Sequence, residues 1–167
     1  MMDEWGCVQQ ACTTTRVQRC DVSEIALVRR LLLVSNGPLL PSTGVWHAAG
    51  VLADGVLPKQ TPGGLARVYA PKTHGAWALQ SACGRTPLRT CAFFSSVAAL
   101  LGGAGQANYS AANACLDALA AWRRVNSTAS ASVQWGAWAE VGMAARGAAA
   151  ERMAAMEAAM EQAGWSL

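Results

Sequence analysis

The segment from Cys91 to Arg124 places the strongest constraint on the fold, because it combines a strand pattern and a helix pattern in one continuous stretch. The apolar run Cys91–Phe94 is bounded by polar residues and predicts a buried strand. A loop of glycine and alanine follows, after which the pattern repeats at spacings of three and four, the period of an α-helix. Tyr109 and Asn113 therefore share one helical face. A strand that leads into a helix is the repeating unit of an α/β domain.

The same alternation extends over most of the chain. Strand patterns are expected at residues 16–20, 44–50, 91–94 and 131–136. Helix patterns follow Ser23 as a cap, run from Thr61 to about Ala82, continue around 109–124 and return at 148–164. Pro71 is expected to interrupt the second of these helices. Alternation of this kind predicts a mostly parallel sheet with helices on both faces.

Composition narrows the class of protein. Apolar residues make up 53% of the 167 residues and charged residues 14%, which favours a globular domain over a disordered chain. The net charge of +3 forms no basic stripe, so we expect no nucleic-acid binding. No apolar run reaches the length of a membrane span, and the amino-terminal segment lacks the basic residues of a signal peptide. We therefore expect a cytoplasmic protein that does not bind membranes. The sequence does not exclude a location inside an organelle.

The six cysteines and two histidines give no metal-site pattern. The cysteines show no paired spacing, and His47 and His74 lie far apart in the sequence. Cys91 and Cys115 fall within apolar periodic segments. We expect reduced cysteines that are mostly buried as small residues, and no bound metal.

Polar side chains meet where the expected strand leads into the expected helix. A hydroxyl of Ser95 or Ser96 can point toward the Tyr109 phenol, with Asn113 one helical turn further on. A phenol can give a proton to an oxygen that gains negative charge, and a fixed hydroxyl can hold that oxygen. A free phenol ionises only near pH ~10, so such an acid benefits from a nearby cation. Lys72 is a candidate, although a solvated surface position is the usual fate of a lysine.

Taken together, Lys72, Ser96, Tyr109 and Asn113 resemble the active-site tetrad of the ketoreductase domains of modular polyketide synthases, a branch of the short-chain dehydrogenase/reductase superfamily. Separations of 24, 13 and 4 residues, within FFSS and GQANYSAAN, carry the resemblance. It implies a Rossmann-like doubly wound fold and NADPH-dependent reduction of a β-ketoacyl thioester on acyl carrier protein, in polyketide or fatty-acid biosynthesis. Other domains of the synthase would be partners.

The resemblance also implies a role for each member of the tetrad. Tyr109 would donate the proton, and Ser96 would hold the carbonyl oxygen. Lys72 would act on the tyrosine and contact the cofactor ribose. Asn113 would complete the proton path, through its amide or by holding a water.

Further residues are assigned to the cofactor by the same resemblance. Asp21 and Val22 lie in a CDV segment whose aspartate would approach the adenine amino group. Ala48, Ala49 and Gly50 lie in an HAAG segment that would pass under the cofactor. From spacing alone, tight packing is the better explanation of such small residues, and it is the resemblance that favours a role at the cofactor.

Three residues would govern the substrate and the configuration of the product. Asp54 matches the last aspartate of a leucine-aspartate-aspartate motif that marks B-type domains, although Ala53 replaces its middle residue. Leu101 stands where A-type domains carry tryptophan. Residues 137–164, which include Met143, would form a substrate lid. The resemblance therefore favours a B-type domain.

Part of the expected fold has no counterpart in the sequence. Nothing before Arg16 resembles the glycine-rich turn that would hold the cofactor pyrophosphate, so residues 1–167 are expected to be a partial ketoreductase domain, with the likeness covering about Cys20 to Gly164. The strand at 16–20 would then be the third and that at 44–50 the fourth, which leaves two strand edges open and the first segment poorly anchored. Two alternatives stay open: a non-catalytic synthase fragment and a free-standing short-chain reductase.

Overall fold

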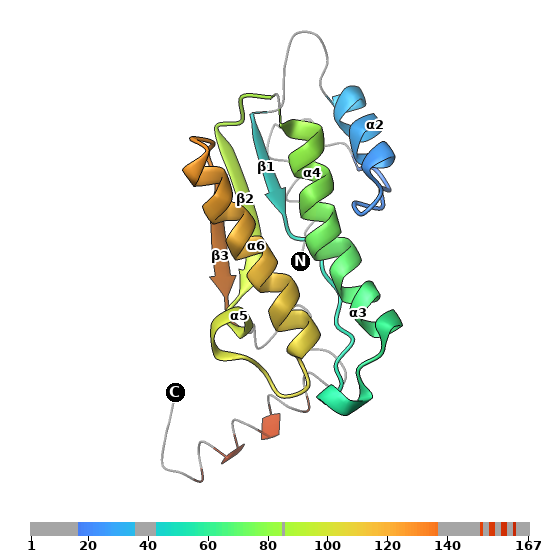
Figure 1. Ribbon diagram of the computed structural model, residues 1–167, viewed down its shortest axis with the longest axis vertical. Coiled ribbons are helices and arrows are strands. Elements are labelled where there is room, and N and C mark those ends of the chain that lie inside the picture. Colours follow the sequence, from blue (N-terminus) through green and yellow to red (C-terminus); the bar gives the residue numbers. More distant parts are fainter. Residues whose placement is uncertain are drawn as a thin grey trace, which may run out of the picture.

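The computed structural model describes residues 17–35, 43–84 and 86–136, together with positions 151, 154, 155, 158, 159 and 162. Its strands are β1 (Gly44–His47), β2 (Thr90–Ser96) and β3 (Ala131–Trp135). Its helices are α2 (Ile25–Ser35), α3 (Pro62–Tyr69), α4 (Gly75–Cys83), α5 (Ala98–Leu101) and α6 (Ala107–Val125). A 3-10 turn, η1 (Leu57–Lys59), precedes α3, and a π turn, η2 (Ala70–His74), joins α3 to α4. Strands and helices alternate along the chain (Figure 1).

The strands of the described residues form one parallel sheet in the order β1-β2-β3. Gly44 of β1 pairs with Thr90 of β2, and Ala92 of β2 pairs with Ala131 of β3. The segment from α3 to α4 connects β1 to β2, and α6 connects β2 to β3. The predicted α/β class with a parallel sheet is therefore confirmed.

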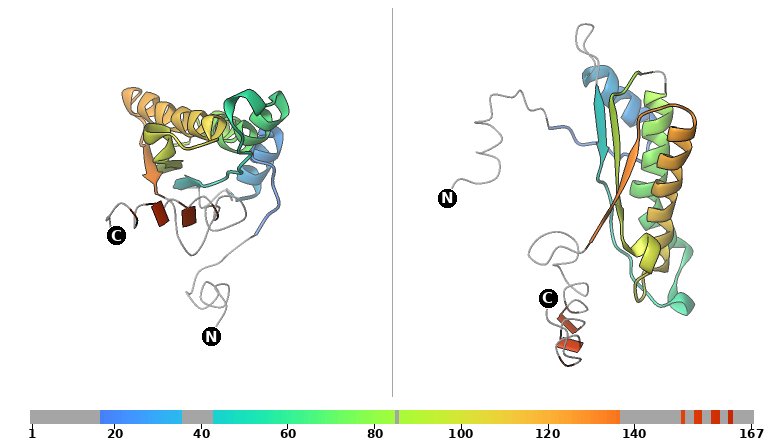
Figure 2. Two further views of the ribbon diagram at one scale, coloured as in Figure 1. Left: turned by 90° about the horizontal axis from the view of Figure 1, so that it is seen from below. Right: turned by 90° about the vertical axis from the view of Figure 1, so that its left-hand side faces the viewer.

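In this part of the chain, α4 and α6 cover one face of the sheet, and α2 packs beside α4 (Figure 2). Right-handed crossovers that advance in one direction across a sheet return on the same face. A doubly wound sheet gains its second helical layer only where the strand order reverses. The described strands contain no reversal, so the helices predicted on both faces are seen here on one face.

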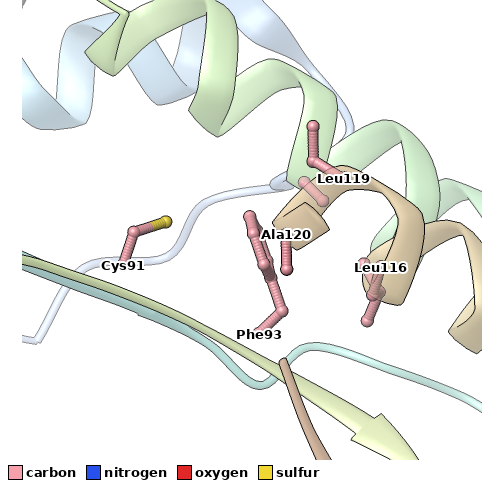
Figure 3. Close-up of a cluster of buried hydrophobic side chains, with 6 residues drawn as sticks. Cys91, Phe93, Leu116, Leu119 and Ala120 are labelled. Atoms are coloured by element: carbon pink, nitrogen blue, oxygen red, sulfur yellow. The ribbon is translucent and has the colours of Figure 1, made fainter. Parts of the chain in front are cut away.

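The hydrophobic core lies between β2 and α6. Alternate side chains of β2 point toward the helices, where Cys91 and Phe93 pack against Leu116, Leu119 and Ala120 of α6 (Figure 3). Burial of this kind stabilises a fold by about 1.5–3 kcal/mol for each large apolar side chain. The core therefore fixes α6, whose first turn carries Tyr109, against β2.

The opposite face of the sheet is apolar and open among the described residues. Trp46 of β1 is 63% exposed, and Val133 and Trp135 of β3 are 38% and 39% exposed. The ring of Phe94 packs against that of Trp135, with 5.5 Å between their centroids. Within these residues β1 pairs with β2 alone, which agrees with the predicted open strand edge.

The helical segment between β1 and β2 begins where the sequence predicts. The Thr61 hydroxyl accepts a hydrogen bond from the Gly64 N–H at 3.0 Å, and Pro62 occupies the first turn. The interruption predicted at Pro71 takes the form of the π turn η2. Proline has no N–H to donate, and its ring crowds the carbonyl four residues earlier, so the regular helix pattern cannot continue through it. The extra residue in this turn sets the direction in which Lys72 leaves the helix.

Two predictions for the amino-terminal part are wrong. Residues 17–20 form no strand, and Val17 is 68% exposed, because no neighbouring strand among the described residues supplies the hydrogen bonds that a strand requires. Ser23 is not the cap of α2, since its N–H and hydroxyl both donate to the Asp21 carboxylate. The first bond of the helix runs instead from the Val28 N–H to the Glu24 carbonyl.

The described cysteines, Cys20, Cys83, Cys91 and Cys115, are free thiols. Burial raises the pKa of Cys83 and of Cys91, so both stay protonated at neutral pH. Cys20 and Cys115 are partly exposed, so the prediction of burial holds for the other two. The helices of the described residues include none with the length and apolar character needed to cross a bilayer.

Candidate active site

The site is built around Tyr109, in the first turn of α6. Tyr109 is 9% exposed and packs with Val68, Ala98 and Ala112 in a second apolar cluster. Asn113 lies one helical turn further along and is fully buried, as the shared helical face predicts. Both side chains therefore lie inside the protein, close to the carboxyl end of β2.

Lys72 reaches this site from the π turn. Its ammonium donates a hydrogen bond to the Phe94 carbonyl at 3.0 Å and lies 5.3 Å from the centroid of the Tyr109 ring. The side chain is 3% exposed, so Lys72 is not a solvated surface lysine. Burial lowers its pKa to about 8, and the more distant Asp117 carboxylate opposes this shift. The structure thus brings the predicted cation and the predicted phenol together.

Gly50 makes room for this lysine. A Cβ atom at Gly50 would lie 2.9 Å from Lys72 Cε and 3.5 Å from its Nζ. The small residue that was expected to let a cofactor approach the backbone therefore admits the stem of Lys72. The sequence contained the signal, a glycine at the end of a strand, but not the identity of the group that packs on it.

Asn113 joins its own helix to the neighbouring strand. Its side-chain N–H donates to the Tyr109 carbonyl at 2.8 Å, and its own carbonyl accepts from the Ser95 hydroxyl at 3.3 Å. Its side-chain oxygen is buried and has no hydrogen-bond partner among the described residues. A buried polar atom of this kind requires an explanation, and a bound water or substrate group would supply one.

The structure distinguishes the two serines that end β2. Ser95 is 3% exposed, and its hydroxyl links the strand to α6 through the hydrogen bond to the Asn113 carbonyl, so its role is structural. Ser96 points to the other side of the strand and accepts a hydrogen bond from the Ala98 N–H at 3.2 Å. No hydrogen bond joins Ser96 to Tyr109 within the described residues, so the role predicted for Ser96 stays a prediction.

The residues predicted to contact the cofactor lie mainly in two segments, one before α2 and one after β1. Ala48 and Ala49 follow the carboxyl end of β1 without regular structure, and Ala48 is exposed. Val22 packs against α4, where a Cβ at Gly75 would meet its Cγ2 at 2.8 Å. Asp21 is exposed, and its hydrogen bonds from Ser23 lower the pKa of its carboxyl group.

Asp54, one of the residues predicted to govern configuration, lies in a loop that contacts the loop between α5 and α6. The Gly55 N–H, next to Asp54, donates to the Gly105 carbonyl at 2.8 Å, so the Asp54 loop contacts the loop before α6. Leu101 ends α5 and is 84% exposed. Met143 and the expected lid, 137–164, fall outside the described residues apart from a few positions in its second half.

His47 was not predicted to belong to the site. It ends β1, is 3% exposed, and its Nε2 lies 3.0 Å from the Lys72 carbonyl. A Cβ at Gly75 would lie 3.1 Å from its Cε1, so glycine is needed there as well. In the sequence His47 is one of two histidines without a metal-site pattern and the first residue of the HAAG segment, and no local pattern links it to a residue 25 positions away.

We expect His47→Asn to reduce the loss of stability at acid pH. Burial lowers the pKa of His47, with the hydrogen bond to the Lys72 carbonyl opposing the shift. The unfolded chain takes up this proton near the ordinary value of 6.5 and the folded chain does not, so the free energy of unfolding falls as the pH falls below about 6.5. Urea unfolding between about pH 7 and pH 5 measures the slope. His74→Asn, at an exposed position, is the control, and equal slopes in both variants contradict the assignment.

Residues 3–140 of the chain match the family of the KR domain. The chain is 43% identical over 122 residues to the phthioceranic/hydroxyphthioceranic acid synthase of Mycobacterium bovis (strain BCG / Pasteur 1173P2), which covers 73% of this chain and 6% of the synthase. It is 46% identical over 129 residues to the spectinabilin polyketide synthase system protein NorB of Streptomyces orinoci, with 77% and 6% covered. The chain thus spans a small part of the relatives it matches.

Solved structures give the same result for the fold. An A-type ketoreductase from a modular polyketide synthase superposes with a TM-score of 0.82 at 34% identity, over 88% of this chain and 31% of that chain. A C2-type ketoreductase superposes with a TM-score of 0.77 at 32% identity, over 88% and 32%. Since domains of different types match, the likeness does not select a type for this chain. The parallel sheet, the match over residues 3–140 and the identity to these synthases show that the chain belongs to the KR domain family.

Proposed function

We propose that this site reduces the β-keto group of an acyl thioester carried by an acyl carrier protein, within a cytoplasmic synthase that holds further domains. The observation that carries the proposal is the buried Lys72 ammonium, 5.3 Å from the centre of the Tyr109 ring. A charge that costs free energy to bury is kept where it serves a function. Membership of the KR domain family supports the same reaction.

Each member of the site has a defined task in this proposal. Tyr109 donates a proton to the oxygen of the substrate ketone as that oxygen gains negative charge. The Lys72 ammonium stabilises the charge that remains on the phenol, because it is held near the ring in a site with little water. Ser96 holds the ketone oxygen. The Asn113 side-chain oxygen, which has no hydrogen-bond partner among the described residues, binds a water through which the next proton reaches Tyr109.

Reduction also requires a hydride, which NADPH would supply when bound. The residues present fit one side of that cofactor. Ala48 and Ala49 offer small side chains at the carboxyl end of β1, the edge where open α/β sheets bind their ligands. Lys72 offers a donor for a ribose hydroxyl, and the exposed Asp21 carboxylate suits the polar edge of an adenine.

The reaction is tested by mixing the protein with NADPH and a β-ketobutyryl thioester of pantetheine. We expect NADPH absorbance to fall while the β-hydroxybutyryl thioester appears in equal amount by mass spectrometry. The same reaction with NADH measures the cofactor preference. NADPH oxidation without any hydroxyacyl thioester would exclude the proposed substrate class.

A second candidate, a non-catalytic fragment of a synthase, is favoured by one observation. The described residues build a sheet of β1, β2 and β3 alone, and one apolar face of it is open. Titration with NADPH by fluorescence separates the two candidates. Micromolar binding by the 167-residue chain would contradict the fragment hypothesis, and no binding together with no turnover would support it.

A further inference from the structure

His47, the last residue of β1, contacts the backbone of the turn that carries Lys72. Its Nε2 lies 3.0 Å from the Lys72 carbonyl. A carbonyl oxygen can only accept a hydrogen bond, so Nε2 carries the proton and donates it. The ring is 3% exposed, and burial lowers its pKa, so the ring is neutral at and above neutral pH. His47 is therefore an uncharged donor that joins β1 to a residue 25 positions later.

The turn that receives this bond, η2, cannot form the full set of helical hydrogen bonds. Pro71 has no N–H to donate, and the Gly75 N–H is shared between the Ala70 and Lys72 carbonyls. A π turn of this kind is rare and is found mainly at functional sites. Because the helical segment itself holds Lys72 incompletely, a donor from another element is needed to fix its backbone, and His47 supplies that donor.

The ring of His47 has little room to move. It meets the Phe93 ring edge-on, with 6.3 Å between the centroids and 81° between the planes. A Cβ atom at Gly75 would lie 3.1 Å from the His47 Cε1 and 2.8 Å from the Val22 Cγ2. The ring is therefore packed against the backbone of Gly75 on one side and against Phe93 on another. A ring confined in this way presents its N–H in one fixed direction.

Lys72 is held at both ends by two neighbouring strands. Its carbonyl accepts from His47 of β1, and its ammonium donates to the Phe94 carbonyl of β2 at 3.0 Å. His47 pairs with Phe93 in the register of the sheet, so both anchors lie at the same level of the sheet. With these two contacts in place, the ammonium lies 5.3 Å from the centre of the Tyr109 ring.

We propose that His47 is a positioning residue, which holds the Lys72 backbone and thereby sets where the Lys72 ammonium lies relative to Tyr109. Its effect on reduction rests on the proposed ketoreduction, whereas its effect on Lys72 rests on the contacts alone. Without the donor, Lys72 is held at the ammonium end only, and the ammonium can move from the ring toward water. Tyr109 then loses the cation that stabilises its ionised form, and the pKa of Lys72 rises because burial no longer lowers it.

The pKa of Lys72 reports the position of its ammonium. Among the described residues, the charged and titratable groups that act on Lys72 from neighbouring elements are Asp117 and Tyr109 of α6 and His47 of β1. His47 is neutral near pH 8, and the other two groups stay in place when residue 47 is substituted. A change in the Lys72 pKa in a variant of His47 therefore reflects movement of the ammonium rather than loss of a charge.

Two substitutions separate the hydrogen bond from the packing of the ring. His47→Leu keeps an apolar side chain of similar size and has no donor. His47→Gln places an amide N–H at about the reach of the ring Nε2, so it keeps the bond to the Lys72 carbonyl. A role in packing alone predicts that both variants behave alike, whereas positioning predicts a defect in His47→Leu that His47→Gln avoids. His74→Leu, at an exposed histidine in the same π turn, is the matched control.

Two quantities are measured for each variant. Lys59 and Lys72 are the two lysines of the sequence, so a chain labelled with 15N-lysine gives two side-chain signals by NMR, and the exposed Lys59 is the internal reference. The pH titration of the other signal gives the pKa of Lys72. The kcat and KM for reduction of the β-ketobutyryl thioester with NADPH are measured over the same pH range.

We expect Lys72 to titrate near pH 8 in the parent chain and in His47→Gln, and closer to its ordinary value of 10.5 in His47→Leu. The kcat of His47→Leu should fall about 10- to 100-fold with little change in KM, because a small misplacement of a group at the site has an effect of this size. His47→Gln should recover most of the lost kcat. His74→Leu should match the parent chain in both measurements.

An unchanged Lys72 titration in His47→Leu overturns the positioning role, and equal effects of His47→Leu and His47→Gln overturn the hydrogen bond as its cause. A shifted titration with an unchanged kcat overturns the effect on reduction. If the parent chain shows no turnover, the proposed ketoreduction fails, while the titration still decides whether His47 positions Lys72. Should His47→Leu not fold, His47→Asn, whose shorter amide does not reach the Lys72 carbonyl, is compared with His47→Gln in its place.

Discussion

Tyr109→Phe is expected to lower the rate of β-ketoacyl reduction by about 100- to 10,000-fold, the range that a positioned general acid contributes. The change removes one oxygen and leaves the ring. The ring packs among Val68, Ala98 and Ala112, so these apolar contacts persist in the variant. The hydrogen bonds from the Tyr109 N–H to the Asn108 side chain and from the Asn113 side chain to the Tyr109 carbonyl persist as well, because both involve main-chain atoms of residue 109. The variant should therefore fold normally and fail only in proton donation.

The chain contains its own control for this experiment. Tyr69 is the only other tyrosine in the sequence, and it packs against the same apolar cluster from the end of α3. Tyr69→Phe removes the same oxygen from a neighbouring position without touching the proposed proton path. Steady-state kinetics and thermal unfolding of both variants are compared with the parent chain. Retention of most turnover in Tyr109→Phe, or an equal loss in both variants, would refute the assignment.

Lys72→Met is expected to abolish most of the activity and at the same time to make the protein more stable. Loss of an electrostatic stabiliser of this kind lowers turnover by about 100- to 1,000-fold. The depressed pKa means that burial of the charged lysine costs about 3 kcal/mol at neutral pH, and methionine fills a similar volume without that cost. The lost hydrogen bond to the Phe94 carbonyl offsets about 1–2 kcal/mol of the gain.

The pH dependence follows from the same pKa. The folded lysine loses its proton near pH 8 and the unfolded lysine near 10.5, so the unfolded chain binds more protons between these values. The free energy of unfolding of the parent chain therefore receives a contribution that rises with pH over this window, and turnover falls as pH rises through about 8. Lys72→Met should show neither effect. Lys59→Met, at the chain's other lysine, is exposed and serves as the control, and an unchanged or lower stability of Lys72→Met would contradict the buried charge.

Local patterns in the sequence were sufficient for the order of the main elements from α2 to β3. A run of apolar residues located β2, and the 3.6-residue period located α6, because these signals arise between neighbours along the chain. Thr61 and Pro71 marked the start and the interruption of the helical segment for the same reason. The strand expected at 16–20 failed because a strand depends on a partner, and no pattern within five residues records whether that partner is present.

The sequence by itself determined the α/β class, the family and the residue types of the site. The tertiary structure alone decided that Ser95 rather than Ser96 faces Asn113, that the space at Gly50 is taken by Lys72, and that His47 and Asn108 join distant segments to the site. It also decided that Lys72 is buried, and this burial lowers its pKa to about 8. The physical reason is that burial and hydrogen bonding between segments 18 to 55 residues apart depend on how helices pack on the sheet, which no local spacing encodes.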